Sequence, residues 1–315
     1  MVVGASLPAA AVLLGLASFG IGPGWLDLVG ALLVGAAYIA GLAMRTGGRP
    51  VVFGVMALVL GSLAAVSGLD VLRTGAALMV AGSTAVLAVM MTVPAVRFST
   101  AVREALVAAG LSVLGGFAVV GFRPSISVER FDYGSLALAI GLGFALVYRL
   151  GAGWHGLGRR GLAAVVCGTV ALAVSVVYAE LLRQYGSAGV IDQVFAGARW
   201  SRETFGAAPR PLQVLIGWPA LVWGCHMRAR RRQGWWVCVF GCAATVSVAG
   251  TLTNPATGWI EAGLIVAYSL GLGMIIGFIL IRIDLMLTGS RGSRARRAEE
   301  LTAVRPEPKR LYPLL

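Results

Sequence analysis

Apolar runs long enough to cross a membrane alternate with short polar connections along almost the whole chain. They cover residues 5–22, 25–44, 51–68, 74–94, 103–122, 134–150, 161–182, 211–227, 234–253 and 260–283. Each run approaches the length of about 20 residues that a helix needs to cross about 30 Å of hydrocarbon. Backbone groups in lipid must find partners within their own segment, and these runs lack the alternation of barrel strands. The pattern predicts an all-helical integral membrane protein with ten transmembrane helices.

An arginine-rich connection between the eighth and ninth runs indicates the orientation of the chain. It contains Arg228, Arg230, Arg231 and Arg232. A charged side chain at the centre of a bilayer costs roughly 2.5–3.5 kcal/mol, and short arginine-rich connections stay on the cytoplasmic side. With the N-terminus on that side too, the cytoplasmic connections hold 19 basic and 5 acidic residues, and the outer ones hold 7 basic and 8 acidic residues. We therefore expect both termini in the cytoplasm and contact between the four arginines and anionic lipid.

The composition supports a membrane location over nucleic-acid binding. Hydrophobic residues make up 58% of the 315 residues and charged residues only 12%, whereas about a quarter of the residues of soluble proteins are charged. The net charge of +13 is distributed between bilayer-length apolar runs, which favours contact with lipid. Arginine supplies nearly all basic residues, as in GC-rich bacterial genomes. We expect a multi-pass protein of a bacterial inner (plasma) membrane, whose partners are membrane lipids and other membrane proteins, not nucleic acid.

Two segments lie outside the predicted spans. The outer connection 183–210 contains apolar residues at helical spacing between Val190 and Ala198, which predicts a short amphipathic helix that acts as an interfacial strut or as a lid. The stretch 286–315 is basic and poor in apolar residues, which predicts a disordered cytoplasmic tail that is attracted to anionic lipid. The predicted organisation is a transmembrane domain over residues 1–285 followed by this tail.

An inverted repeat of five plus five spans is a further hypothesis, since halves with an odd number of spans have opposite orientations. Three pairs of positions support it. Arg49-Pro50 corresponds to Arg210-Pro211, Pro94 to Pro255, and Glu104 to Glu261, at spacings of 161, 161 and 157 residues.

Four polar residues are candidates for a substrate pathway: Glu104, Glu261, Tyr268 and Ser269. Glu104 and Glu261 each lie near the start of the last span of a half, so the repeat would place them at opposite mouths of a pathway. Tyr268 and Ser269 lie in the middle of the last span and could line a weakly polar route. The alternative for the two acids is a structural one, because the helix dipole favours an acid at a helix N-terminus.

The chain carries no recognised catalytic motif and no zinc-binding spacing of cysteine and histidine. Cys225, Cys238 and Cys242 lie with His226 in the cytoplasmic half, but cysteine is also an ordinary small buried residue. We predict no catalytic residue, no metal and no cofactor. Glycines such as those of Gly273-x-x-x-Gly277 predict close helix packing instead.

Two functions fit these observations. Ten short spans with both ends in the cytoplasm favour a permease-like or flippase-like protein for a neutral or lipidic solute. The alternative is a non-catalytic subunit or assembly factor of a larger cell-envelope complex, favoured by the lack of buried charge at mid-membrane depth and by the basic tail. An enzyme is not expected.

Overall fold

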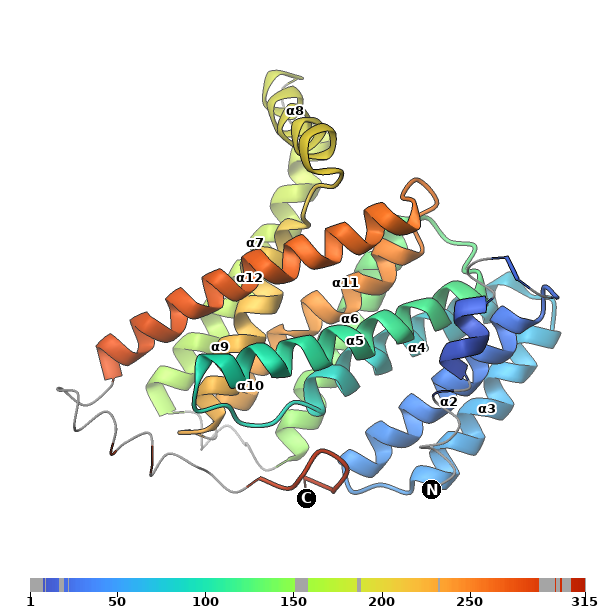
Figure 1. Cartoon of the computed structure of the whole chain (residues 1–315), viewed down its shortest axis with the longest axis horizontal. Helices are drawn as coiled ribbons and strands as arrows, with labels where there is room; N and C mark the ends of the chain where they lie inside the picture. Colours follow the sequence, from blue (N-terminus) through green and yellow to red (C-terminus); the bar gives the residue numbers. More distant parts are fainter. Residues whose placement is uncertain are drawn as a thin grey trace.

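A computed structural model describes residues 8, 10–16, 20–21, 23–150, 158–185, 188–231, 233–288, 298, 301 and 307–314. Every regular element in this part of the chain is a helix (Figure 1), so the all-helical prediction is confirmed. The helices are α2 (Leu26–Arg45), α3 (Pro50–Val66), α4 (Asp70–Met90), α5 (Phe98–Phe122), α6 (Val128–Arg149), α7 (Gly158–Tyr185), α8 (Ala188–Phe205), η2 (Gln213–Gly217), α9 (Trp218–Arg228), α10 (Gly234–Phe240), α11 (Cys242–Leu252) and α12 (Trp259–Thr288).

Two of the predicted spans are helices with an internal irregularity. The run 211–227 begins with η2, a π-helical turn, and continues as α9, whose second residue is Pro219. Proline lacks the amide that an α-helix interior requires, and π-helical turns accommodate such interruptions. The run 234–253 is divided at Gly241 into α10 and α11. The first predicted span, 5–22, falls partly outside the described residues, and Ala10–Leu16 within it are helical.

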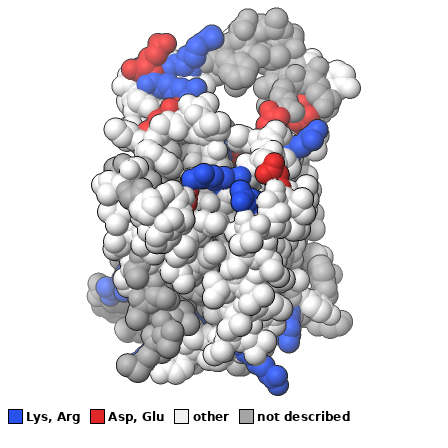
Figure 2. All heavy atoms as spheres, turned by 90° about the vertical axis from the view of Figure 1, so that its right-hand side faces the viewer, with Lys and Arg blue, Asp and Glu red and all other residues white. Residues whose placement is uncertain are grey.

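Six helices in the described part of the chain are long and apolar enough to cross a membrane. They are Leu26–Arg45, Asp70–Met90, Phe98–Phe122, Val128–Arg149, the continuous stretch Gly234–Leu252, and Trp259–Thr288. Two shorter helical stretches, Pro50–Val66 and Val165–Tyr178, are also apolar. In Figure 2 a wide uncharged band separates the charged side chains near the two ends of the molecule. Length, composition and surface together indicate a multi-pass membrane protein.

The centre of the bundle is packed around α11. This helix contacts α4, α5 and α6, and all of its residues except Leu252 are buried. Small residues allow the close approach: Gly115 lies against Thr84, and Gly273 lies so close to Trp218 that an added Cβ would be 2.5 Å from the tryptophan Cβ. These contacts confirm that glycines serve helix packing in this protein.

The segments outside the apolar spans differ from one another in structure. The outer connection forms a longer helix than expected, α8, which follows α7 and projects beyond the end of the bundle (Figure 1). At the other extreme of the molecule, residues 307–314 pack against the end of α2 (Figure 1), with the Leu314 amide donating to the Arg45 carbonyl at 2.9 Å. We call these two extremes the α8 end and the tail end.

Candidate functional site

Three buried charged residues, Arg45, Glu104 and Arg228, gather at the tail end of the bundle and form what we call the arginine cluster. Arg45 and Arg228 lie in the last turns of α2 and α9, where the helix dipole favours a cation. Glu104 lies in the second turn of α5. None of the three residues is more than 1% exposed. Buried charges are tolerated only with partners, so the partners define what the cluster does.

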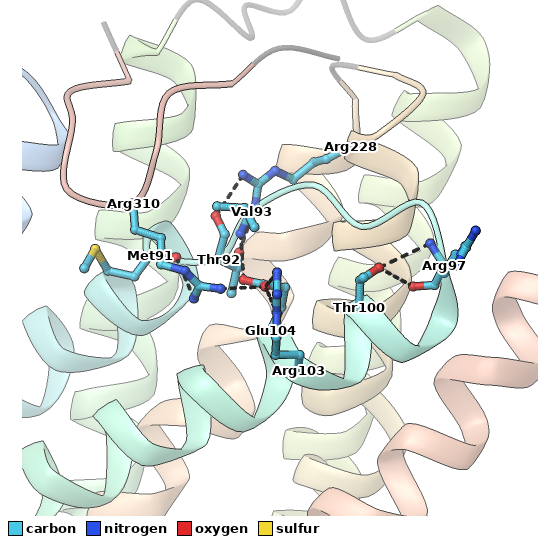
Figure 3. A network of polar contacts seen from close by, with 9 residues as sticks. All are labelled: Met91, Thr92, Val93, Arg97, Thr100, Arg103, Glu104, Arg228 and Arg310. Atoms are coloured by element: carbon cyan, nitrogen blue, oxygen red, sulfur yellow. Dashed lines mark hydrogen bonds and ion pairs between the residues drawn. The ribbon is translucent and has the colours of Figure 1, made fainter. Parts of the chain in front are cut away.

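Glu104 joins three parts of the chain (Figure 3). Its carboxylate accepts the Val93 amide at 2.9 Å, the Arg103 guanidinium at 3.2 Å and the Arg310 guanidinium at 2.6 Å. Val93 belongs to the connection between α4 and α5, and Arg310 to the C-terminal segment. Glu104 therefore connects α5 to the α4–α5 connection and to the C-terminal segment.

Arg228 is held from two sides. Its guanidinium donates to the Thr92 hydroxyl at 2.8 Å and the Thr92 carbonyl at 3.1 Å, and it pairs with Glu307 at 2.5 Å. It also stacks over the Trp235 ring, 3.5 Å from the ring centroid, which is a favourable cation–π geometry. The Arg228 side chain is thus occupied by protein groups.

The other predicted lipid-contacting arginines are placed differently from Arg228. Arg230 and Arg231 are half-buried, and Arg232 lies outside the described residues. Contact with anionic lipid stays a prediction for all of them.

The other predicted pathway residues lie at the α8 end. Glu261 pairs with Arg202 at 3.1 Å, and the Tyr268 hydroxyl donates to the Phe205 carbonyl at 3.0 Å. Ser269 is buried and accepts the Arg210 amide at 3.0 Å. These three residues attach α12 to α8 and to the connection that follows it. Glu104 is far from them, at the tail end.

A partly exposed ion pair at the α8 end was not anticipated from the sequence. Asp132 of α6 pairs with Arg210 at 3.1 Å, and its other carboxylate oxygen lies directly against Gly250 of α11. The missing side chain at Gly250 makes room for the carboxylate. The sequence could not reveal this pair, because only the packing of α6 on α11 brings the acid beside the glycine.

A pair of clefts lies along the seam between α6 and α7. The cleft at the α8 end has a volume of about 920 Å³, and its lining includes Thr74, Leu78, Ser127, Arg130, Tyr133 and Glu180. The cleft at the tail end has a volume of about 400 Å³ and is lined by Phe144, Ala145, Tyr148, Val165, Thr169 and Trp236. The first cleft is amphipathic and the second is mainly apolar.

An exposed stretch of α6 lies between the two clefts along the helix. Between Tyr133 and Tyr148 the exposed positions are small residues at helical spacing, Gly134, Ala137, Gly141 and Ala145. A Cβ added at Gly141 would meet no atom within 4 Å. α6 and α7 are not among the closely packed helix pairs, and α7 makes its main contacts with α10 and η2. We call the two clefts and the small-residue surface between them the α6–α7 groove.

The sequence did not identify the α6–α7 groove, and none of the four predicted pathway residues is among the side chains that line its clefts. Two tyrosines that bracket a row of small residues on α6 were the available signal. Among the described residues, no group of three or more His, Cys, Asp or Glu side chains comes together as a metal site would require.

No protein-family model matches the chain, and no curated protein or solved structure is significantly similar to it.

Proposed function

We propose that the protein is a flippase-like membrane protein that moves a lipidic solute along the α6–α7 groove. The observation that carries this proposal is the amphipathic cleft between α4, α6 and α7. Polar and charged groups of Arg130, Tyr133 and Glu180 share it with the apolar side chain of Leu78. A lipid has the same two-part chemistry, with a polar headgroup and an apolar tail.

The middle of the groove supports passage along α6. A headgroup in hydrocarbon is costly because its polar atoms lose water without gaining partners. Small side chains at Ala137, Gly141 and Ala145 leave room for a headgroup beside the helix, while the acyl chains stay in the bilayer. Hydroxyl groups of Tyr133 near one end, and of Tyr148 and Thr169 near the other, offer partners at both ends of this route.

A route through the centre of the bundle has less support. Buried alanine, glycine and valine residues fill the space around α11, and Thr245 of α11 donates to the Ala85 carbonyl of α4 at 3.2 Å. A solute that enters the core would have to separate these contacts. The lateral groove requires the opening of one exposed hydrogen bond between α6 and α7, which the Tyr133 hydroxyl donates to Glu180 at 3.3 Å.

For the topology we propose ten spans with both termini in the cytoplasm, so that the tail end faces the cytoplasm. The distribution of basic residues supports this orientation. We do not carry the inverted repeat into the proposal. Its counterparts pack differently, since α2 lies along α5 whereas α7 makes no comparable contact with α12.

Lipid translocation in proteoliposomes tests the proposal. The purified full chain is reconstituted with a trace of a phospholipid that carries a fluorescent headgroup label, and an impermeant reductant bleaches the outer leaflet. We expect the protein to bring inner-leaflet lipid to the reductant faster than in protein-free vesicles. Gly141→Trp fills the groove and is expected to lower this rate towards the protein-free value.

Gly110→Trp is the matched control. Gly110 is an exposed glycine of α5, and a Cβ added there also meets no atom within 4 Å. We expect it to keep the wild-type rate. Equal rates for the protein, both variants and protein-free vesicles would reject the proposal and favour the alternative of a non-catalytic subunit.

A further inference from the structure

The C-terminal segment 307–314 occupies the arginine cluster through electron-rich oxygen atoms. Arg45 donates to the carbonyls of Lys309 and Tyr312 at 2.9 and 2.7 Å, and more weakly to that of Pro308 at 3.4 Å. The Glu307 carboxylate pairs with Arg228 at 2.5 Å. Carbonyl and carboxylate oxygens of the chain thus fill the acceptor positions that two buried guanidinium groups present.

The two arginines keep donors that the segment does not satisfy. Within the described part of the chain, Nη2 of Arg45 and Nε of Arg228 are buried and have no hydrogen-bond partner. A buried donor without an acceptor loses its hydration and gains nothing in return. The segment is therefore an incomplete match to the cluster.

The charge of the region also exceeds what the segment supplies. Among the described residues, Arg45, Arg103, Arg228 and Arg310 face only the two carboxylates of Glu104 and Glu307. Glu104 is already bound by Arg103 and by the Val93 amide, so it remains neutralised when the segment leaves. The remaining pair, Arg45 and Arg228, is a cationic site without a carboxylate of its own.

We infer that Arg45 and Arg228 form a binding site for the phosphate group of an anionic lipid headgroup. In this structure the segment 307–314 occupies the site, and the headgroup displaces it when it binds. A phosphate group has more acceptor oxygens than a carboxylate and binds guanidinium groups through paired hydrogen bonds. Its additional oxygens are acceptors of the kind that the two unpartnered donors, Nη2 of Arg45 and Nε of Arg228, require. Headgroup and segment then compete for the same two arginines.

The position of the site favours a lipid as the source of the phosphate. Arg45 ends a helix long and apolar enough to cross a membrane, and Trp235, near the start of the helix that follows Arg228, stacks on the Arg228 guanidinium. Tryptophan is enriched at the level of lipid headgroups. Displacement of residues 307–314 removes Glu307 from Arg228 and the carbonyls of Lys309 and Tyr312 from Arg45. The inference does not rest on transport, since binding is measured at equilibrium.

The first experiment measures binding of phosphatidylglycerol to the full-length protein in detergent by native mass spectrometry. Glu307→Gln removes the charge that pairs the segment 307–314 with Arg228 and leaves Arg45 and Arg228 unchanged. It is therefore expected to tighten phosphatidylglycerol binding about tenfold. Glu261→Gln makes the same charge change at the α8 end and is expected to bind like the wild type. Arg45→Gln is expected to lose binding. Diacylglycerol, which has the same tails without phosphate, is expected not to compete.

Hydrogen exchange supplies a second readout that does not depend on the Arg45 variant folding. The Leu314 amide donates to the Arg45 carbonyl, so displacement of the segment is expected to speed its exchange when phosphatidylglycerol is added. Equal binding by wild type and Glu307→Gln together with unchanged exchange would overturn the inference. Faster exchange with inorganic phosphate alone would support the phosphate site and overturn the lipid as its source.

Discussion

Gly250 of α11 lies directly against the carboxylate of Asp132 of α6, so a single added methyl group would collide with a charged oxygen. Asp132 is fixed in this position by its pair with Arg210 at 3.1 Å. Gly250→Ala is therefore expected to lower the stability in detergent by roughly 1–3 kcal/mol, as overpacking of a core does. Thermal unfolding followed by tryptophan fluorescence measures this loss.

The Gly250 effect should depend on Asp132. In an Asp132→Ala background the carboxylate is gone, so Gly250→Ala is expected to cost much less there. Gly110→Ala, at an exposed glycine with free space, is expected to cause no loss. An equal cost of Gly250→Ala in both backgrounds would show that the collision is not with Asp132.

Glu104 and Glu261 provide a second comparison, because the repeat hypothesis treats them as equivalents. Glu104 is fully buried and has three partners, so Glu104→Gln is expected to cost roughly 1.5–3 kcal/mol. The side chain of Glu261 is 25% exposed and that of its partner Arg202 is 57% exposed, so Glu261→Gln is expected to cost less than about 1 kcal/mol. Similar unfolding temperatures for the two variants would contradict the expectation that the more deeply buried acid contributes more to stability.

Arg228 and Arg231 test whether the arginine-rich connection has one role or two. Arg228 is buried in an ion pair and a stacking contact, so Arg228→Gln is expected to cost roughly 3–5 kcal/mol. Arg231 is half-buried, and Arg231→Gln is expected to leave the unfolding temperature nearly unchanged. Equal losses of stability in the two variants would show that the contributions of Arg228 and Arg231 do not depend on their burial.

Neutralising Arg228, Arg230, Arg231 and Arg232 together is a separate test of topology. This change is expected to invert or destabilise the last spans while the first seven keep their sidedness. Reporter fusions at Gly258 measure the outcome. An unchanged sidedness at this position would mean that other residues determine the orientation.

The orientation itself can be tested with single cysteines. In a background with Cys167 replaced by serine, Ser127→Cys at the α8 end is expected to react with an impermeant thiol reagent added to intact cells. Ser99→Cys at the tail end is expected to react only after lysis. Both serines are exposed, so access through the membrane decides the result. Labelling of Ser99→Cys in intact cells would overturn the proposed cytoplasmic location of the tail end.

Local sequence properties determined much of this architecture. The length and continuity of the apolar runs predicted the helices from α2 to α12 other than α8, because a backbone in lipid can satisfy its hydrogen bonds only within such segments. Helical spacing in the 183–210 connection predicted α8, and the glycines predicted close packing. The ten-span count, the location of the termini and the function stay predictions.

Only the tertiary structure decided which polar residues meet. The sequence placed Glu104 and Glu261 as equivalent acids, but their environments differ because burial depends on neighbours from distant segments. A composition that predicted a disordered tail could not reveal that residues 307–314 pack on Arg45 and Arg228, since the partners lie on α2 and α9. The α6–α7 groove likewise exists because α7 packs on α10 and not along α6, and no property of either helix alone dictates that choice.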